Sequence, residues 1–111
     1  MKDYSELHDQ QINTLVCQAL ELKMSSYARI MTLDDATVLL ADNQTLVDYC
    51  NNPADAWPII VDNHITIKPV KRVRNYNEYY DSWEASGVCA FEEHDNPLRA
   101  AMIVFLVMQD H

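Results

Sequence analysis

The fold is decided by Asn96-Pro97-Leu98-Arg99-Ala100-Ala101-Met102-Ile103-Val104-Phe105-Leu106-Val107-Met108, which contains the longest apolar run of the sequence. Asn96 is a favoured N-cap residue, and Pro97 suits the first helical position, where a missing N–H costs nothing. The nine residues after Arg99 are all apolar, so they cover every side of the expected helix. The run is about half as long as the roughly 18 residues that cross a bilayer. We therefore predict a buried C-terminal helix, with a homodimer as the alternative if one apolar side is left for a partner.

The composition indicates one folded domain over residues 1–111. Of the 111 residues, 49% are apolar and 23% are charged, which is typical of a globule and not of a disordered tail. The formal net charge is −9, so the surface repels nucleic acid and favours a basic partner. Gly87 is the only glycine, and this excludes phosphate-binding loops of the dinucleotide and P-loop kinds, which need several glycines.

The cysteines and the first residues bear on cofactors and location. Cys17, Cys50 and Cys89 are widely spaced and form no Cys-x-x-Cys pair, so they indicate neither a disulfide framework nor a zinc site. The four histidines share no ligand-like spacing, and we expect no metal and no cofactor. No apolar leader follows Met1, which predicts a cytoplasmic protein with free thiols and no membrane segment.

Apolar periodicity and capping residues predict two further helices. In residues 1–23, spacings of three and four divide the side chains into an inner set, Ile12, Leu15, Val16, Ala19 and Leu20, and an outer set, Gln11, Asn13, Gln18 and Glu21. A middle helix from Pro53 to Asp62 follows the cap residue Asn52, with Asp55 as a capping-box carboxylate. Pro58 lies near the start of this helix, which can therefore continue with a kink.

The remaining segments predict short strands and turns. Alternating apolar residues and Asp-rich turns indicate two strands in residues 27–33 and 36–43, although residues 38–41 also fit a helical turn. The later segments are, in order, a strand at 65–68, a loop or extended hairpin arm at 69–81, a strand at 83–91 bulged at Gly87, and an acidic turn at 92–95. The chain is thus predicted to be α+β, with a small sheet packed with an N-terminal helix, a middle helix and a buried C-terminal helix.

The first candidate site lies between residues 48 and 57. It mixes carboxylates, an amide and aromatic rings that could line a polar pocket: Asp48, Tyr49, Asn52, Asp55 and Trp57. The structural alternative is a capped helix whose Tyr49 and Trp57 pack into the core.

The second candidate site combines four of the eight basic residues with three tyrosines: Lys68, Lys71, Arg72, Arg74, Tyr76, Tyr79 and Tyr80. Cations that bind phosphates and rings that stack on bases are typical of single-strand binders. The net charge of −9 opposes this use, and a solvated loop that pairs with the protein's own acids is the alternative.

The third candidate site is acidic and consists of Glu84, Glu92, Glu93 and Asp95. These carboxylates could imitate nucleic-acid phosphates or dock on a basic groove of another protein. An ordinary solvated surface is the alternative, because runs of charge are usually exposed to water.

Three parts of the sequence carry a family resemblance: Asp3-Tyr4-Ser5-Glu6-Leu7 with Ile12-Asn13, then Tyr49-Cys50-Asn51-Asn52-Pro53-Ala54-Asp55-Ala56-Trp57-Pro58-Ile59-Ile60, and residues 96–109. They resemble the NinX-type proteins of lambdoid and P22-like bacteriophages. Segments 25–46 and 68–91 are less diagnostic, and the additional cysteines that family members often carry in the first of them are missing here. The resemblance implies a phage accessory protein and transfers no catalytic residues.

The leading hypothesis is therefore a non-enzymatic phage accessory protein that binds a host or phage protein. By analogy with small accessory proteins of this class, it would inhibit a host defence or nucleic-acid-processing factor through its acidic surface. The first alternative is a small-molecule binder or enzyme that uses residues 48–57. The second alternative is a single-stranded nucleic-acid binder that uses residues 68–80.

Overall fold

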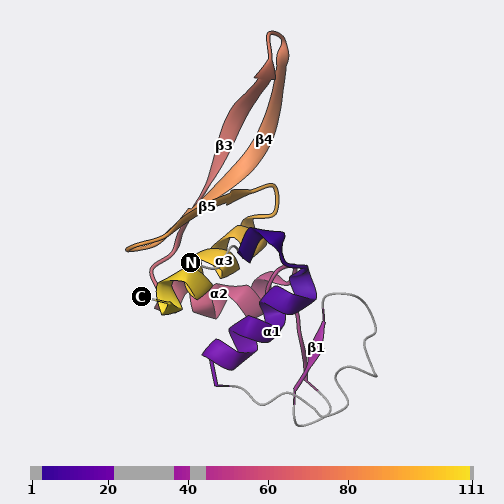
Figure 1. Cartoon of the computed structure of the whole chain (residues 1–111), viewed down its shortest axis with the longest axis vertical. Helices are drawn as coiled ribbons and strands as arrows, with labels where there is room; N and C mark the ends of the chain where they lie inside the picture. Colours follow the sequence, from indigo (N-terminus) through magenta and orange to yellow (C-terminus); the bar gives the residue numbers. More distant parts are fainter. Residues whose placement is uncertain (1–3, 22–36, 41–44, 111) are drawn as a thin grey trace.

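Helix α3 (Pro97–Gln109) lies at the centre of the fold, as its apolar sequence predicts (Figure 1). The computed structural model describes residues 4–21, 37–40 and 45–110. All eight residues from Arg99 to Leu106 are buried, so most of the helix is surrounded by the rest of the chain. The Asn96 side chain caps the helix by accepting hydrogen bonds from the N–H groups of Leu98 (3.0 Å) and Arg99 (3.2 Å).

Helix α1 (Asp9–Ala19) packs against α3 after a short 3₁₀ turn, Tyr4–Glu6. Its apolar face is confirmed for Ile12 and Val16, which are fully buried. The prediction that Asn13 faces outwards is wrong, because Asn13 is 0% exposed. Its amide can be buried at low cost since it donates to Asp48 Oδ1 (2.9 Å) and accepts from the Cys50 N–H (3.1 Å).

Helix α2 (Pro53–Asp62) has the predicted bounds and the predicted cap, because Asn52 Oδ1 accepts from the Ala54 N–H over 3.0 Å. The capping-box role predicted for Asp55 is wrong. Its carboxylate instead accepts from the N–H of Asp48 (3.0 Å) and so fixes the turn that precedes the helix. Tyr49 packs into the core as expected, whereas Trp57 does not: it is 61% exposed.

Two antiparallel sheets complete the fold. Strands β1 (Val38–Leu39) and β2 (Leu46–Val47) form one, and β3 (Thr66–Asn75), β4 (Glu78–Ser86) and β5 (Phe91–His94) form the other, in the order β3-β4-β5. The strand expected at residues 27–33 lies outside the described residues, and so does part of the one expected at 36–43. The three-stranded sheet packs on α3 mainly through β4 and β5.

The segment expected to be a loop or hairpin arm is a hairpin arm. Strands β3 and β4 continue past the end of β5 and project from the body of the molecule (Figure 1). The whole molecule, with this projection, measures 51 × 29 × 27 Å. The name hairpin arm is used below for residues 70–82, from the register pair Val70 and Ser82 to the turn at Tyr76 and Asn77. Polar residues occupy both faces of these strands, so their sequence lacks the alternation that distinguishes a strand from a loop.

The single strand predicted from Trp83 to Phe91 is wrong. Strand β4 ends at Ser86, the chain reverses, and β5 begins at Phe91, so Glu92 and Glu93 lie in a strand and not in an acidic turn. Gly87 is not a bulge but the first residue of this reversal, where its N–H donates to the Ala90 carbonyl (2.9 Å). A Cβ atom at Gly87 would lie 2.5 Å from Met108 Sδ, which explains the glycine.

Candidate functional site

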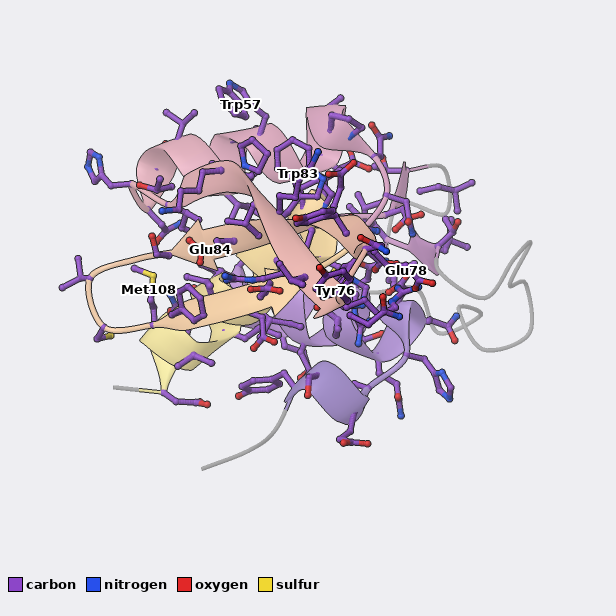
Figure 2. All side chains as sticks on the ribbon, turned by 90° about the horizontal axis from the view of Figure 1, so that it is seen from above. Trp57, Tyr76, Glu78, Trp83, Glu84 and Met108 are labelled. Atoms are coloured by element: carbon purple, nitrogen blue, oxygen red, sulfur yellow. The ribbon has the colours of Figure 1, made fainter. Side chains whose placement is uncertain are left out.

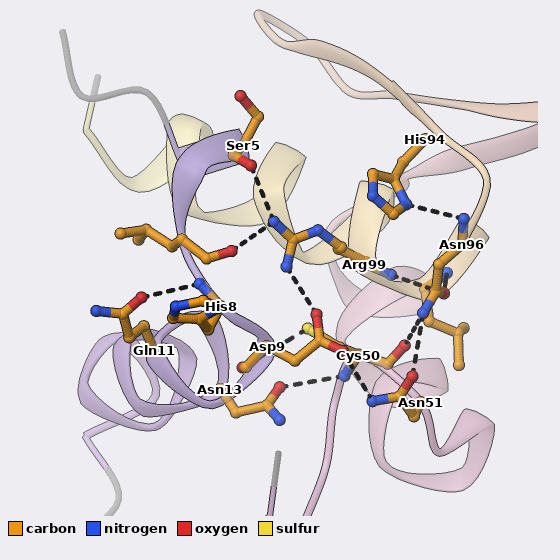
Figure 3. Close-up of polar contacts among 12 residues, drawn as sticks. Ser5, His8, Asp9, Gln11, Asn13, Cys50, Asn51, His94, Asn96 and Arg99 are labelled. Atoms are coloured by element: carbon orange, nitrogen blue, oxygen red, sulfur yellow. Dashed lines mark hydrogen bonds and ion pairs between the residues drawn. The ribbon is translucent and has the colours of Figure 1, made fainter. Parts of the chain in front are cut away.

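Arg99 is the only charged residue of α3 and is the starting point of the polar network in the body. Its side chain is buried, with 7% exposure, and reaches the segment before α1 (Figure 3). Nη1 donates to Asp9 Oδ1 (2.7 Å), and Nη2 donates to the carbonyls of Ser5 (3.1 Å) and Leu7 (2.6 Å). Nε is buried and has no hydrogen-bond partner among the described residues.

A network of side-chain amides continues from this ion pair. Asn96 Nδ2 donates to the Cys50 carbonyl (2.8 Å) and to Asn51 Oδ1 (3.1 Å), while Asn51 Nδ2 donates to Asp9 Oδ2 (3.2 Å). Three segments that are distant in the chain meet here: the start of α1, the turn before α2 and the start of α3 (Figure 3). The network therefore fixes Asp9 from two sides and orients its carboxylate towards Arg99.

A pocket of about 760 Å³ opens beside this network. It is lined by the first residues of α1 and by the start of α3: Leu7, His8, Asp9, Gln10, Gln11, His94, Asn96 and Arg99. We call it the Arg99 groove. Two helices begin at its wall, and helix N-termini carry partial positive charge. The groove can therefore accept a hydrogen-bond acceptor or an anionic group.

The two histidines of the groove flank the Arg99–Asp9 pair (Figure 3). Nδ1 of His94 accepts a hydrogen bond from the backbone N–H of Asn96 (2.9 Å), so the neutral ring carries its proton on Nε2. Asp95 Oδ1 also lies 2.8 Å from Nδ1, but that carboxylate is 85% exposed, and the fixed backbone donor decides the tautomer. The remaining ring N–H of His94 is thus a donor.

Sequence reasoning missed the Arg99 groove. Its members are distant in the chain, and His8, Asp9 and His94 are common surface residues when taken singly. One signal was available. Arg99 stands alone among apolar residues of a helix expected to be buried, and a buried guanidinium requires a carboxylate and several acceptors.

The structure does not bring the first candidate group into one cavity. The Asp48 backbone N–H donates to the Asp55 carboxylate, and Asn52 caps α2. Tyr49 is buried, with its O–H 3.9 Å from Cys17 Sγ, and desolvation raises its pKa above the ordinary tyrosine range. Trp57 projects from α2 at the edge of the molecule (Figure 2).

Among the candidate acids, Glu84 and Glu93 bind basic side chains of the same sheet. Arg72 donates from Nε to Glu93 Oε1 (2.9 Å) and from Nη2 to Glu84 Oε1 (3.0 Å), and Lys68 Nζ lies 3.2 Å from Glu84 Oε2. The hydrogen bond from Arg72 lowers the pKa of Glu93. Strand alternation places Glu92 on the opposite face, in register with Ala85, and Asp95 follows the strand end.

The seven basic and aromatic residues of the second group all lie on β3, β4 and the turn between them. Lys68 and Arg72 are paired as just described, Lys71 faces Asp81 at 3.9 Å, and the guanidinium of Arg74 lies 5.0 Å from the centre of the Tyr80 ring. Tyr76 at the tip is 93% exposed (Figure 2). Val73 and Tyr79 are cross-strand neighbours, 65% and 64% exposed.

The three thiols divide into two environments. Cys17 and Cys50 are buried, and desolvation raises the pKa of both. Cys89 is exposed in the turn between β4 and β5. Within residues 4–21, 37–40 and 45–110, no three His, Cys, Asp or Glu side chains are grouped closely enough to hold a metal ion.

In the part of the chain that the structure describes, no helix combines the length and apolarity that a bilayer crossing requires.

Comparison with known proteins places the chain in a family. Neither a curated protein nor a solved structure matches the chain significantly. A family model described as Bacteriophage P22, NinX matches residues 3–109, nearly the whole chain, and the protein therefore belongs to the NinX family of bacteriophage proteins.

Proposed function

We propose that this NinX-family protein is a non-enzymatic phage accessory protein that binds a host or phage protein through its hairpin arm. The observation that carries the proposal is the exposed surface made by Val73, Tyr76 and Tyr79, which we call the arm surface. Exposed tyrosines are frequent anchors of protein interfaces, because a ring buries a large area and loses little conformational entropy.

The arm surface continues a face of the sheet that is buried at its root. On this face Ile67 and Ala85 pack against the core, and strand alternation leads outwards from them to Val73 and Tyr79. The root of the face packs on the helices, whereas its outer end projects beyond them (Figure 1). On this face the Lys71–Asp81 pair lies between the buried root and the arm surface, so a partner protein that covered the outer end would bury an apolar patch bordered by this ion pair.

The charge of the remaining molecule favours a basic partner. Strands β3 and β4 with their turn contain four basic and three acidic residues, whereas the rest of the chain contains four basic and fourteen acidic residues. Opposite charge on a partner accelerates encounter and aligns the two surfaces. Proteins that hold nucleic acid carry basic surfaces, so a host defence or nucleic-acid-processing factor in the cytoplasm of the infected cell is the proposed target, and inhibition is the proposed effect.

The alternatives receive less support from the contacts. A single-strand binder needs free cations, but Lys68 and Arg72 are engaged by Glu84 and Glu93. A ligand pocket at residues 48–57 would need Trp57 to face Asp48 and Asp55, and its ring is mostly exposed instead.

The test is an affinity purification from host lysate with tagged wild-type protein and two matched variants. The arm variant Val73→Ser/Tyr76→Ser/Tyr79→Ser removes all three side chains of the arm surface, and Trp57→Ser removes an exposed aromatic ring from α2 outside the arm. We expect one stoichiometric protein with wild type and with Trp57→Ser, and its loss with the arm variant. Equal recovery by the arm variant, or recovery of no protein by the wild type, would contradict the proposal.

Charge steering is tested separately on the recovered complex. Asp95→Lys reverses a carboxylate whose side chain is 85% exposed and lies outside the arm surface. We expect slower association and a weaker dependence of the rate on salt, with little change in dissociation. An unchanged association rate would remove the acidic surface from the proposal and leave the arm surface as the only contact.

A further inference from the structure

We infer that the Arg99 groove is a binding site for a small molecule that carries an oxyanion, either a carboxylate or a phosphate group. This site lies in the body of the molecule, and it does not depend on binding by the hairpin arm. It rests on three observations, which concern the unpaired donor on Arg99, the orientation of His94 and the volume of the groove.

The unpaired donor is the Nε–H of Arg99. The guanidinium is buried and makes three hydrogen bonds through Nη1 and Nη2, yet Nε has no partner among the described residues. A buried donor without an acceptor is unfavourable, and buried polar groups are rarely left so. Because Nε is closed to water, an oxygen atom bound in the groove supplies this acceptor once the side chains that cover Nε move aside.

The second donor is the ring of His94. Because its Nδ1 accepts from the Asn96 N–H, the neutral ring presents its other N–H, and His94 lines the same groove as Arg99. The acceptors nearby are already occupied: the Asp9 carboxylate receives Arg99 and Asn51, and the carbonyls of Ser5 and Leu7 receive Arg99. With these acceptors engaged, the Arg99 Nε–H and the His94 ring N–H remain as donors that an oxyanion would satisfy.

The surroundings set the size and charge of the ligand. The groove measures about 760 Å³, within the range of small-molecule sites. Asp9 balances the charge of Arg99, while the N-termini of α1 and α3 add partial positive charge. These fields favour a group with one or two negative charges on a small molecule, and the acidic body disfavours a polyanion such as nucleic acid.

The direct test is an NMR titration of the full chain with sodium phosphate and, separately, with sodium acetate, each compared with sodium chloride at equal ionic strength. The reporters are the Arg99 Nε–H and the His94 ring signals. We expect saturable shifts of both reporters with at least one of the two anions. Saturation by phosphate alone assigns a phosphate group, saturation by acetate alone assigns a carboxylate, and saturation by both assigns any oxyanion.

Variants separate a site from a general salt effect. His94→Asn can keep the acceptor for the Asn96 N–H but is too short to replace the donor at Nε2, so it is expected to weaken anion binding about fivefold, as the loss of one hydrogen bond would. His64→Asn is the matched control, because His64 is an exposed histidine outside the groove and asparagine tolerates its φ of 53°. Shifts equal to those with chloride, or an Arg99 Nε–H signal that does not move, would overturn the inference. Neither result requires a variant of Arg99, whose substitution could prevent folding.

Discussion

The side chains of Arg99 and Asp9 stand 90 positions apart in the chain and 2.7 Å apart in the fold. Their ion pair joins the start of α3 to the start of α1, and the Arg99 side chain is almost closed to water while that of Asp9 is partly exposed. Removing either partner would leave the charge of the other unpaired, and this cost is what makes the pair important for stability.

Replacing Arg99 by Met is expected to lower the free energy of unfolding by about 3 kcal/mol, because Asp9 and two backbone carbonyls lose their donor. Urea unfolding measures this change. Lys71→Met is the matched control: its contact with Asp81 is exposed on both sides, and its effect should stay within about 0.5 kcal/mol. Equal changes in the free energy of unfolding for the two substitutions would show that the buried ion pair does not stabilise the contact between α1 and α3.

Glu93 is expected to make the fold sensitive to acid. The hydrogen bond from Arg72 lowers the pKa of Glu93 in the folded state, so its stabilising effect is complete above the ordinary glutamate pKa. That effect is lost as the pH falls through the lowered value. Thermal unfolding of Glu93→Gln between pH 7 and pH 3 should therefore show a smaller loss of Tm than wild type. Glu78→Gln, on the exposed arm, should follow the wild-type curve, and a Glu93→Gln curve that also follows it would contradict the assignment.

Tyr4 is expected to cause part of the loss of stability at alkaline pH. Its O–H donates to Asp110, and this bond raises the pKa of Tyr4 to about 12. A raised folded-state pKa means that stability is complete below the unfolded pKa of 10.0 and falls as the pH rises towards 12. Tyr4→Phe should cost about 1 kcal/mol at neutral pH and flatten the decline between those values. Tyr76→Phe, at the exposed tip, should do neither, and an unaltered alkaline decline in Tyr4→Phe would refute the role of this bond.

Gly87 is expected to be required by packing and not by backbone conformation, since its φ is not positive. An alanine Cβ would meet Met108 Sδ at 2.5 Å and Val104 Cγ1 at 3.2 Å. Gly87→Ala should therefore cost about 1 kcal/mol, at the low end for overpacking because the methionine side chain is flexible. The cost should largely vanish in a Met108→Ala background. Equal costs in the two backgrounds, measured by urea unfolding, would point to the backbone instead.

The helices that begin with Asn-Pro were predictable because local chemistry determines them. Asn52-Pro53 and Asn96-Pro97 set the starts of α2 and α3, and the apolar run after Arg99 required burial wherever the chain folded. Prediction failed where tertiary partners decide. Asn13 looks polar and exposed until Asp48 and Cys50 satisfy its amide, and Glu92 looks like part of a turn until β4 pairs with it.

The sequence predicts which residue types gather in each candidate site, but not how their side chains are arranged. The basic and aromatic group of residues 68–80 does share one hairpin, but no pattern indicated which cations would be paired by Glu84 and Glu93. The Arg99 groove depends on three distant segments, and its shape follows from how the helices pack. A single sequence fixes the residue types of such a site, whereas the geometry depends on the fold.

The bond between Tyr4 and Asp110 brings the first and the last described turns of the chain together. A short linker between Tyr4 and Asp110 would therefore close residues 4–110 into a ring, and the chain could be opened between Tyr76 and Asn77 without cutting any helix. In such a circular permutant the body would keep its connections, while the two strands of the arm would lose their covalent turn. Binding that depends on the paired arm would then be separated from ligand uptake in the body, within a chain of almost the same composition.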